Sequence, residues 1–127
     1  MNQAVVAIGS NIEPERNIPA AIEQLEAVMS VLGESRFLHT EPVGPPGQPE
    51  FVNGVVLVET PLDCAGLKSL LRGVESQLGR IRTADRYAPR PIDLDIVVWN
   101  GRIVDDDVRE RDFLRLAIRE VLPALQL

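Results

Sequence analysis

The spacing of the apolar residues changes in a fixed order along this chain. Apolar runs with the pattern of strands occur at 4–8, 36–40, 51–59 and 92–99. Apolar residues recur at helical spacing over 18–32, 67–78 and 113–121. Asn17 is the expected N-cap of the first helix and Gly33 its expected stop, and Asn100-Gly101 predicts a tight turn into a short return strand at 103–104.

This order predicts an α+β fold of the ferredoxin-like βαββαβ type. Its antiparallel sheet carries both main helices on one face, and a short hairpin and a helix follow at the C-terminal end. With 127 residues, 45% of them hydrophobic, the chain has material for one core, so we expect a single domain over 1–127.

Charge and hydropathy limit the function further. The formal net charge of −6 argues against a broad cationic surface for nucleic acid or membrane binding. No apolar stretch has the length of a membrane span and no basic, apolar leader opens the sequence, so a cytoplasmic location is expected. The pattern does not predict an oligomeric state.

Two acidic residues stand in an otherwise apolar strand. Asp93 and Asp95 lie two positions apart, so both side chains are expected on one face of the sheet. Two adjacent carboxylates repel each other unless a cation lies between them, and hard oxygen ligands suit Mg²⁺. The alternative is a solvated strand face without a metal.

A cluster of arginines directly precedes this pair. Twelve of the thirteen basic residues are Arg, and Arg80, Arg82, Arg86 and Arg90 fall within eleven positions. Guanidinium groups bind phosphate oxygens in a planar fork, so this loop and the aspartates together suit a polyphosphate with Mg²⁺. The alternative is a set of solvated arginines paired with nearby acids.

Phe51 and Asn53 also lie two positions apart, on the strand expected at 51–59. An aromatic ring beside an amide with both donor and acceptor suits a flat, polar heterocycle. The alternative places Phe51 in the core and makes Asn53 a cross-strand filler.

The longest motif, Arg86-Tyr87-Ala88-Pro89-Arg90-Pro91-Ile92-Asp93-Leu94-Asp95, resembles the signature of the 6-hydroxymethyl-7,8-dihydropterin pyrophosphokinases. Further matches are Ala7-Ile8-Gly9-Ser10-Asn11, Thr40-Glu41-Pro42-Val43-Gly44 and Gln48-Pro49-Glu50-Phe51-Val52-Asn53. The resemblance continues through Leu78-Gly79-Arg80-Ile81-Arg82 and resumes at Arg111-Asp112-Phe113. It implies a folate-pathway transferase that moves pyrophosphate from ATP to a pterin alcohol.

The resemblance also implies roles for individual residues. Asp93 and Asp95 would bind two Mg²⁺ ions with ATP, and Asp95, Arg80 and Arg90 would be catalytic. ATP would contact Glu75, Arg80, Arg82, Arg90 and Arg111. The pterin would lie between Phe51 and Phe113, with its polar edge on Asn53, Thr40 and the backbone near Val43.

One segment departs from the family pattern. The stretch 103–111 is short, has no histidine and contains three consecutive aspartates, Asp105, Asp106 and Asp107. These carboxylates would repel a triphosphate, so active transfer predicts that they face solvent. Two alternatives to an active enzyme are a weakened homologue that still binds pterin and a ferredoxin-like regulatory module for a small molecule.

Overall fold

The fold is described by a computed structural model over residues 1–41, 47, 49–80 and 90–127. One sheet contains the strands β1 (Asn2–Ser10), β2 (Ser30–Glu34), β3 (Leu38–Thr40), β4 (Phe51–Thr60), β5 (Asp93–Trp99) and β6 (Arg102–Ile103). The helices are α1 (Pro14–Glu26), α2 (Cys64–Gln77), α3 (Asp107–Glu110) and α4 (Asp112–Val121). The α+β, ferredoxin-like prediction is confirmed.

The sheet is antiparallel, with the strand order β2-β4-β1-β5-β6 and with β3 paired to the start of β4. β1 lies at the centre, and its end at Gly9 is opposite Asn53 on β4 and Asp93 on β5. The sheet thus places the Phe-x-Asn motif and the aspartate pair on the two neighbours of one strand.

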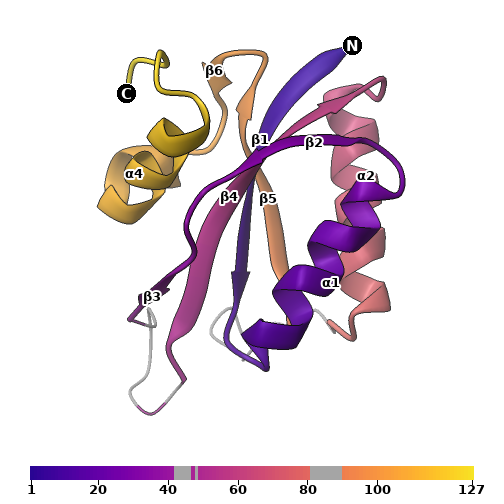
Figure 1. Ribbon diagram of the computed structural model, residues 1–127, viewed down its shortest axis with the longest axis vertical. Helices are drawn as coiled ribbons and strands as arrows, with labels where there is room; N and C mark the ends of the chain where they lie inside the picture. Colours follow the sequence, from indigo (N-terminus) through magenta and orange to yellow (C-terminus); the bar gives the residue numbers. More distant parts are fainter. Residues whose placement is uncertain (42–46, 48, 81–89) are drawn as a thin grey trace.

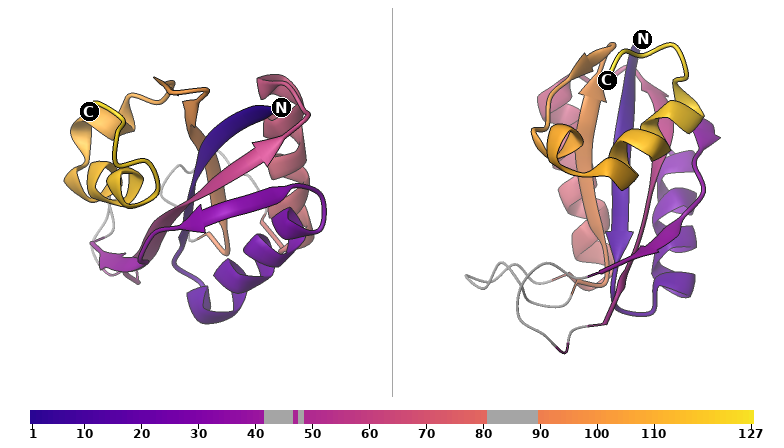
Figure 2. Two further views of the ribbon diagram at one scale, coloured as in Figure 1. Left: turned by 45° about the horizontal axis from the view of Figure 1, so that its top comes forward. Right: turned by 90° about the vertical axis from the view of Figure 1, so that its left-hand side faces the viewer.

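The two faces of the sheet are covered differently, as Figures 1 and 2 show. α1 and α2 lie side by side on one face, over a core that includes Leu25, Leu67 and Leu94. α4 lies on the other face, over a smaller cluster that includes Val55 and Ile118. Because α4 is short and lies toward the end of the sheet where both termini lie, it leaves part of this face uncovered.

The prediction for the first helix was wrong at its C-terminal end. α1 ends at Glu26, and the edge strand β2 (30–34) includes residues 30–32, which we expected to be helical. Along β2 the exposure alternates, and Val31 packs on the core while Leu32 is exposed. The apolar residues over 28–32 match both the helical and the strand period. Pairing with β4 then stabilises the strand.

The predicted N-cap was also wrong. Asn17 lies inside α1, where it is buried and its Nδ2 donates to the Ile12 carbonyl at 2.7 Å. The short helix α3 was not predicted, because its four residues are too few to show a period. The remaining elements agree with the predicted ranges within a few residues at each end.

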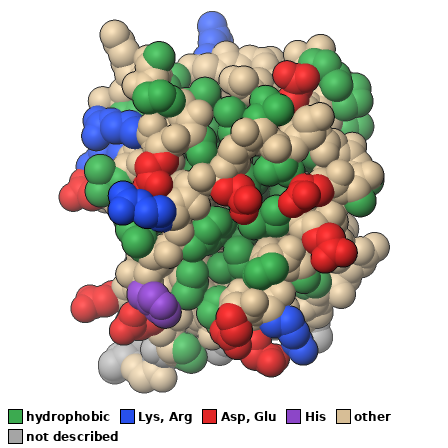
Figure 3. All heavy atoms as spheres, viewed as in Figure 1, with side chains coloured by type: hydrophobic (Ala, Val, Ile, Leu, Met, Phe, Trp, Pro, Cys, Tyr) green, Lys and Arg blue, Asp and Glu red, His purple; other side chains and the backbone are tan. Residues whose placement is uncertain are grey.

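No helix in the described part of the chain has the length and hydropathy needed to cross a membrane. Acidic side chains are spread over the face seen in Figure 3, in keeping with the net charge of −6.

Candidate active site

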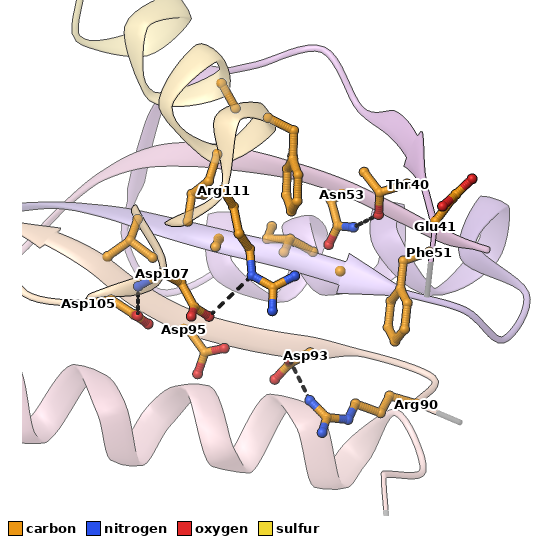
Figure 4. Close-up of a pocket in the computed structure, with 18 residues that line it drawn as sticks. Thr40, Glu41, Phe51, Asn53, Arg90, Asp93, Asp95, Asp105, Asp107 and Arg111 are labelled. Atoms are coloured by element: carbon orange, nitrogen blue, oxygen red, sulfur yellow. Dashed lines mark hydrogen bonds and ion pairs between the residues drawn. The ribbon is translucent and has the colours of Figure 1, made fainter. Parts of the chain in front are cut away.

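A pocket with a volume of about 280 Å³ opens on the sheet face that α4 leaves partly uncovered. Its floor is formed by residues of β1, β4 and β5, and its other walls by residues of β3, α3 and α4 (Figure 4). Thr40, Phe51, Asn53, Arg90, Asp93, Asp95, Arg111 and Phe113 all line it. Eight of the predicted site residues are therefore brought into one cavity.

One end of the pocket is built around the amide of Asn53. Its Nδ2 donates to Thr40 Oγ1 at 2.5 Å, across the β3–β4 pair. Gly9 lies opposite Asn53 in the sheet, and a Cβ on Gly9 would lie 2.4 Å from Asn53 Oδ1. The absence of a side chain at Gly9 thus lets the amide lie against the backbone of β1, with Phe51 as its neighbour in Figure 4.

The other end contains the aspartate pair, and the prediction that both side chains share one sheet face is confirmed. Asp93 and Asp95 line the same pocket, while Leu94 between them is buried in the core under α1 and α2. Arg80 Nη1 donates to Asp93 Oδ1 at 2.7 Å, and Arg90 Nη1 donates to Asp93 Oδ2 at 3.0 Å. Both oxygens of Asp93 therefore have a guanidinium partner.

Asp95 has a different partner, which the sequence analysis missed. Arg72 of α2 places Nη2 3.3 Å from Asp95 Oδ1 and also binds Glu75. Asp95 Oδ2 receives no hydrogen bond from any residue that the structure describes. The helical i,i+3 spacing of Arg72 and Glu75 predicts their own pairing, but nothing in the sequence indicates that this arginine reaches β5.

Glu75 lies beneath the pocket and does not line it. Its side chain is 2% exposed, and its oxygens accept from Arg72 Nη1, Arg80 Nη1 and the Leu94 backbone N–H, each at 2.8 Å. Arg80, 8% exposed, lies between Glu75 and Asp93 and is likewise absent from the pocket wall. A buried carboxylate thus joins Arg72, which contacts Asp95, to Arg80, which contacts Asp93.

The two aspartates have opposite pKa shifts. Burial favours a raised pKa at Asp93, but hydrogen bonds and charges from Arg80 and Arg90 outweigh it and hold the pKa below the ordinary value. Burial raises the pKa of Asp95 to about 6, the charges of Asp93 and Glu75 add to the rise, and Arg72 opposes it. Asp95 is therefore the carboxylate that takes up a proton more easily.

Arg72 itself stays charged. Its partial burial lowers the pKa, but hydrogen bonds and the charges of Glu75 and Asp95 more than offset this effect and raise the pKa above its ordinary value.

The acidic run after β6 does not lie wholly outside the pocket, as active transfer predicts that it should. Asp105 and Asp107 line the pocket, although the Asp107 side chain is also 51% exposed, whereas Asp106 is exposed and does not line it. Asp105 Oδ1 accepts the Asp107 backbone N–H at 2.9 Å, and Asp107 Oδ2 lies 3.8 Å from Nε of Arg111, whose guanidinium extends into the pocket (Figure 4). The Asp105 side chain closes a turn onto the Asp107 backbone just before α3, a local contact that hydropathy alone does not indicate.

The pocket wall carries more negative than positive charge. Among the described residues, its carboxylates belong to Glu41, Asp93, Asp95, Asp105 and Asp107, and its guanidinium groups to Arg90 and Arg111. In this part of the chain no group of three or more acidic, His or Cys side chains is arranged to hold a metal ion by itself. Two carboxylates are nevertheless sufficient for Mg²⁺ when phosphate oxygens and water complete its shell.

Comparison with known proteins gives the family. The profile of the 7,8-dihydro-6-hydroxymethylpterin-pyrophosphokinases matches residues 5–123. The chain belongs to this family. The 2-amino-4-hydroxy-6-hydroxymethyldihydropteridine pyrophosphokinase of Methylorubrum extorquens is 33% identical, with 98% of this chain and 85% of the relative covered.

Two further relatives have the same printed name. The protein from Haemophilus influenzae is 31% identical over 100% of this chain and 86% of its own length. The protein from Pseudomonas aeruginosa is 35% identical over 83% of this chain and 66% of its own length.

The residues that the resemblance to the pyrophosphokinases assigned fall into three groups in space. Eight line the pocket, and Glu75 and Arg80 lie in the ion-pair network under it. Arg82 and Val43 lie outside the described residues. The roles of all these residues in binding or catalysis stay predictions.

Proposed function

We propose that this chain transfers pyrophosphate from ATP to 6-hydroxymethyl-7,8-dihydropterin, giving AMP and the pterin diphosphate. One observation carries the proposal: a family match over residues 5–123 coincides with a pocket that has an aromatic, amide-bearing end beside a paired-carboxylate end. The two ends suit the two halves of such a reaction, a flat heterocycle and a polyphosphate.

At the neutral end, Asn53 binds the polar edge of the pterin. Its amide is fixed by Thr40 and by close contact with Gly9, so it needs no reorientation to exchange hydrogen bonds with the ring. Phe51 and Phe113, which come from β4 and α4, offer apolar surface to the ring faces. The contribution of the backbone near Val43 stays a prediction.

At the charged end, the donor set fits Mg²⁺. The carboxylates of Asp93 and Asp95 are hard oxygen ligands on one face, and Asp95 Oδ2 has no donor among the described residues. Mg²⁺ held there with ATP would neutralise charge on the phosphate oxygens and so would favour attack by the hydroxyl oxygen. The excess of carboxylates in the pocket wall gives an independent reason why ATP needs cations here, and two ions stay our prediction.

The transfer itself is a displacement at the β-phosphorus of ATP. The pterin hydroxyl oxygen bonds to that phosphorus, and the bond from the phosphorus to the α–β bridging oxygen breaks, so that AMP leaves with this oxygen. The hydroxyl proton passes to Asp95 Oδ2. Asp95 lines the pocket, and its Oδ2 receives no hydrogen bond from a described residue, so this oxygen is available to accept the proton.

The arginines bind and orient the phosphates. Arg90 and Arg111 line the pocket, and each is paired there with a carboxylate, Asp93 or Asp107, that phosphate oxygens can replace. Arg80, held by Glu75, keeps Asp93 in place, and we propose that Glu75 acts through this contact. A phosphate contact of Arg82 stays a prediction.

A second candidate function is a homologue that binds pterin but transfers pyrophosphate poorly. The observation that favours it is the presence of Asp105 and Asp107 in the pocket wall, where they repel a triphosphate. This repulsion would not affect the Asn53 end of the pocket, where the pterin is proposed to bind.

One experiment separates the two candidates. AMP release is measured in a coupled assay with ATP, the pterin alcohol and Mg²⁺, with omission of each component as the control. AMP that depends on all three supports the transferase, and AMP no higher than the background without pterin contradicts it. The second candidate instead predicts thermal stabilisation by the pterin with little stabilisation by ATP and Mg²⁺.

A further inference from the structure

The strand that carries the aspartate pair has an open edge where the pair lies. β1 binds one side of β5, and among the described strands only β6 pairs with the other side, at Val98 and Trp99. The Val97 carbonyl accepts the Val104 N–H, so residues 93–96 are the part of β5 without a chain neighbour on that side among the described residues. An open strand edge leaves backbone donors and acceptors to be satisfied by other groups.

Two side chains of α2 satisfy the open edge at Leu94. Glu75 Oε2 accepts the Leu94 N–H at 2.8 Å, and Arg72 Nη1 donates to the Leu94 carbonyl at 2.9 Å. Arg72 and Glu75 also bind each other at 2.8 Å, so the pair takes the place of one residue of a neighbouring strand. It fixes the backbone at the residue between the two aspartates.

The same guanidinium holds Asp95. Nη1 of Arg72 is used by Glu75 and Leu94, and Nη2 lies 3.3 Å from Asp95 Oδ1. Arg72 reaches this contact from the helix layer behind the sheet, and Asp95 Oδ2 receives no hydrogen bond from a described residue. The planar guanidinium of Arg72 thus binds the Leu94 carbonyl and Asp95 Oδ1 at the same time. A lysine ammonium group cannot reproduce this geometry.

We propose that Arg72 is a positioning residue for the transfer: it fixes Leu94 and Asp95 Oδ1 together, so that Oδ2 faces the cation and the substrate hydroxyl. This proposal rests on the proposed function. Arg72 does not line the pocket, so it acts through Asp95. Its positive charge also offsets part of the negative charge of Asp93, Asp95 and Glu75.

Loss of the Arg72 contacts should lower kcat, whereas loss of its positive charge should raise the affinity for Mn²⁺. In Arg72→Gln, Asp95 loses its tether, so kcat falls about tenfold while KM for the pterin stays unchanged. The lost positive charge leaves the carboxylates more attractive to cations, so Mn²⁺ binds about fivefold more tightly. A general loss of structure would weaken Mn²⁺ binding and lower kcat together.

The experiment measures both quantities in matched variants. Steady-state AMP formation gives kcat and KM, and electron paramagnetic resonance of free Mn²⁺ gives its affinity without ATP or pterin. Lys68→Gln is the matched control, since it removes the same charge from an exposed side chain one turn earlier in α2. We expect wild-type kcat and Mn²⁺ affinity from this control.

The proposal is overturned if Arg72→Gln keeps the wild-type kcat or binds Mn²⁺ more weakly than the wild type. It is also overturned if Lys68→Gln shows the same changes as Arg72→Gln, or if the wild-type protein does not bind Mn²⁺. In the Asp95→Asn background, Arg72→Gln should lower residual kcat less than twofold, and a full tenfold further loss would show a role independent of Asp95.

A conservative variant keeps the test valid if Arg72→Gln does not fold. Arg72→Lys retains the charge but not the fork, so Mn²⁺ affinity should stay at the wild-type value while kcat falls severalfold. Wild-type kcat in this variant would overturn the positioning role. Absence of AMP from the wild-type chain would instead reject the proposed function, and the Mn²⁺ comparison would still test the action of Arg72 on Asp95.

Discussion

The two ends of the pocket are held by different kinds of interaction. At the Asn53 end the amide is placed by one neutral hydrogen bond and by its contact with Gly9, which a side chain would prevent. At the Asp95 end, carboxylates and guanidinium groups hold one another, and ligands must replace some of these pairs. The neutral end therefore has its binding geometry before a ligand arrives, whereas the charged end must exchange some of its ion pairs when a ligand binds.

This difference suggests that one end of the pocket recognises the heterocycle and the other controls the rate of transfer. A steric arrangement keeps its shape when pH or salt changes, so the Asn53 end can discriminate one heterocycle under many conditions. A charge network responds to each added cation or phosphate, so we expect the Asp95 end to control the transfer step of the proposed reaction. The following predictions test this division, in order of expected effect.

Asp95→Asn should reduce AMP formation about 10³-fold, because it removes both the proposed cation ligand and the proposed proton acceptor, which together would contribute several kcal/mol. Pterin binding, measured by calorimetry, should stay within twofold of wild type. Asp106→Asn, which changes an exposed aspartate outside the pocket, is the control and should be fully active. Loss of pterin affinity in Asp95→Asn would show that the two ends are not separate.

Gly9→Ala should reverse that pattern. The added methyl displaces Asn53 Oδ1, so pterin affinity should fall about 30-fold, equivalent to one or two hydrogen bonds, while ATP affinity is unchanged. Titration calorimetry with each ligand measures both. Gly73→Ala, where the methyl meets open space on α2, should bind pterin normally. Unchanged pterin affinity in Gly9→Ala would contradict the steric arrangement of this end.

Asp107→Asn should tighten ATP binding about threefold, because it removes one negative charge from the pocket wall and frees Arg111 from its partner. The KM for ATP at fixed Mg²⁺ reports the change, and Asp106→Asn again serves as control. A higher KM would mean that Asp107 helps to hold the nucleotide and its cations.

The smallest expected effect concerns the stability of the metal-free protein. The pKa of Asp95 is raised to about 6, above its unfolded value near 4, so its contribution to stability is complete below about pH 4 and is lost as pH rises through about 6. Asp93 has the opposite shift, and its contribution is lost at acidic pH, below the range of this test.

With EDTA present, raising the pH from 5 to 7 should therefore lower Tm by about 2 °C more in the wild type than in Asp95→Asn. The effect is small because the Asp95 side chain is 43% exposed. Equal pH profiles in the two proteins would mean that Asp95 is ionised throughout this range.

The sequence predicted most of the sheet because its strands have clear patterns. The valine-rich run at 51–59 and the Asp-x-Asp pair on β5 lie where their periods indicate. The end of α1 could not be predicted, because residues 28–32 satisfy the helix and the strand period, and only pairing with β4 separates them.

The site was predicted unevenly for a similar reason. Local spacing places Asp93 and Asp95 on one face, but the difference between their environments depends on which arginine reaches each carboxylate. Arg72 is far from both aspartates in the sequence and gave no signal. The placement of Asp105 and Asp107 in the pocket wall likewise depends on how the short helix α3 packs, which its four residues do not indicate.

The bracing of Leu94 by Arg72 and Glu75 also bears on solubility. An uncovered strand edge is a template on which another polypeptide can add by β-pairing, a common start of aggregation. Here the Leu94 N–H and carbonyl are both occupied by helix side chains. Arg72 and Glu75 therefore also protect this strand edge, and their loss would leave the Leu94 backbone open to β-pairing with another molecule.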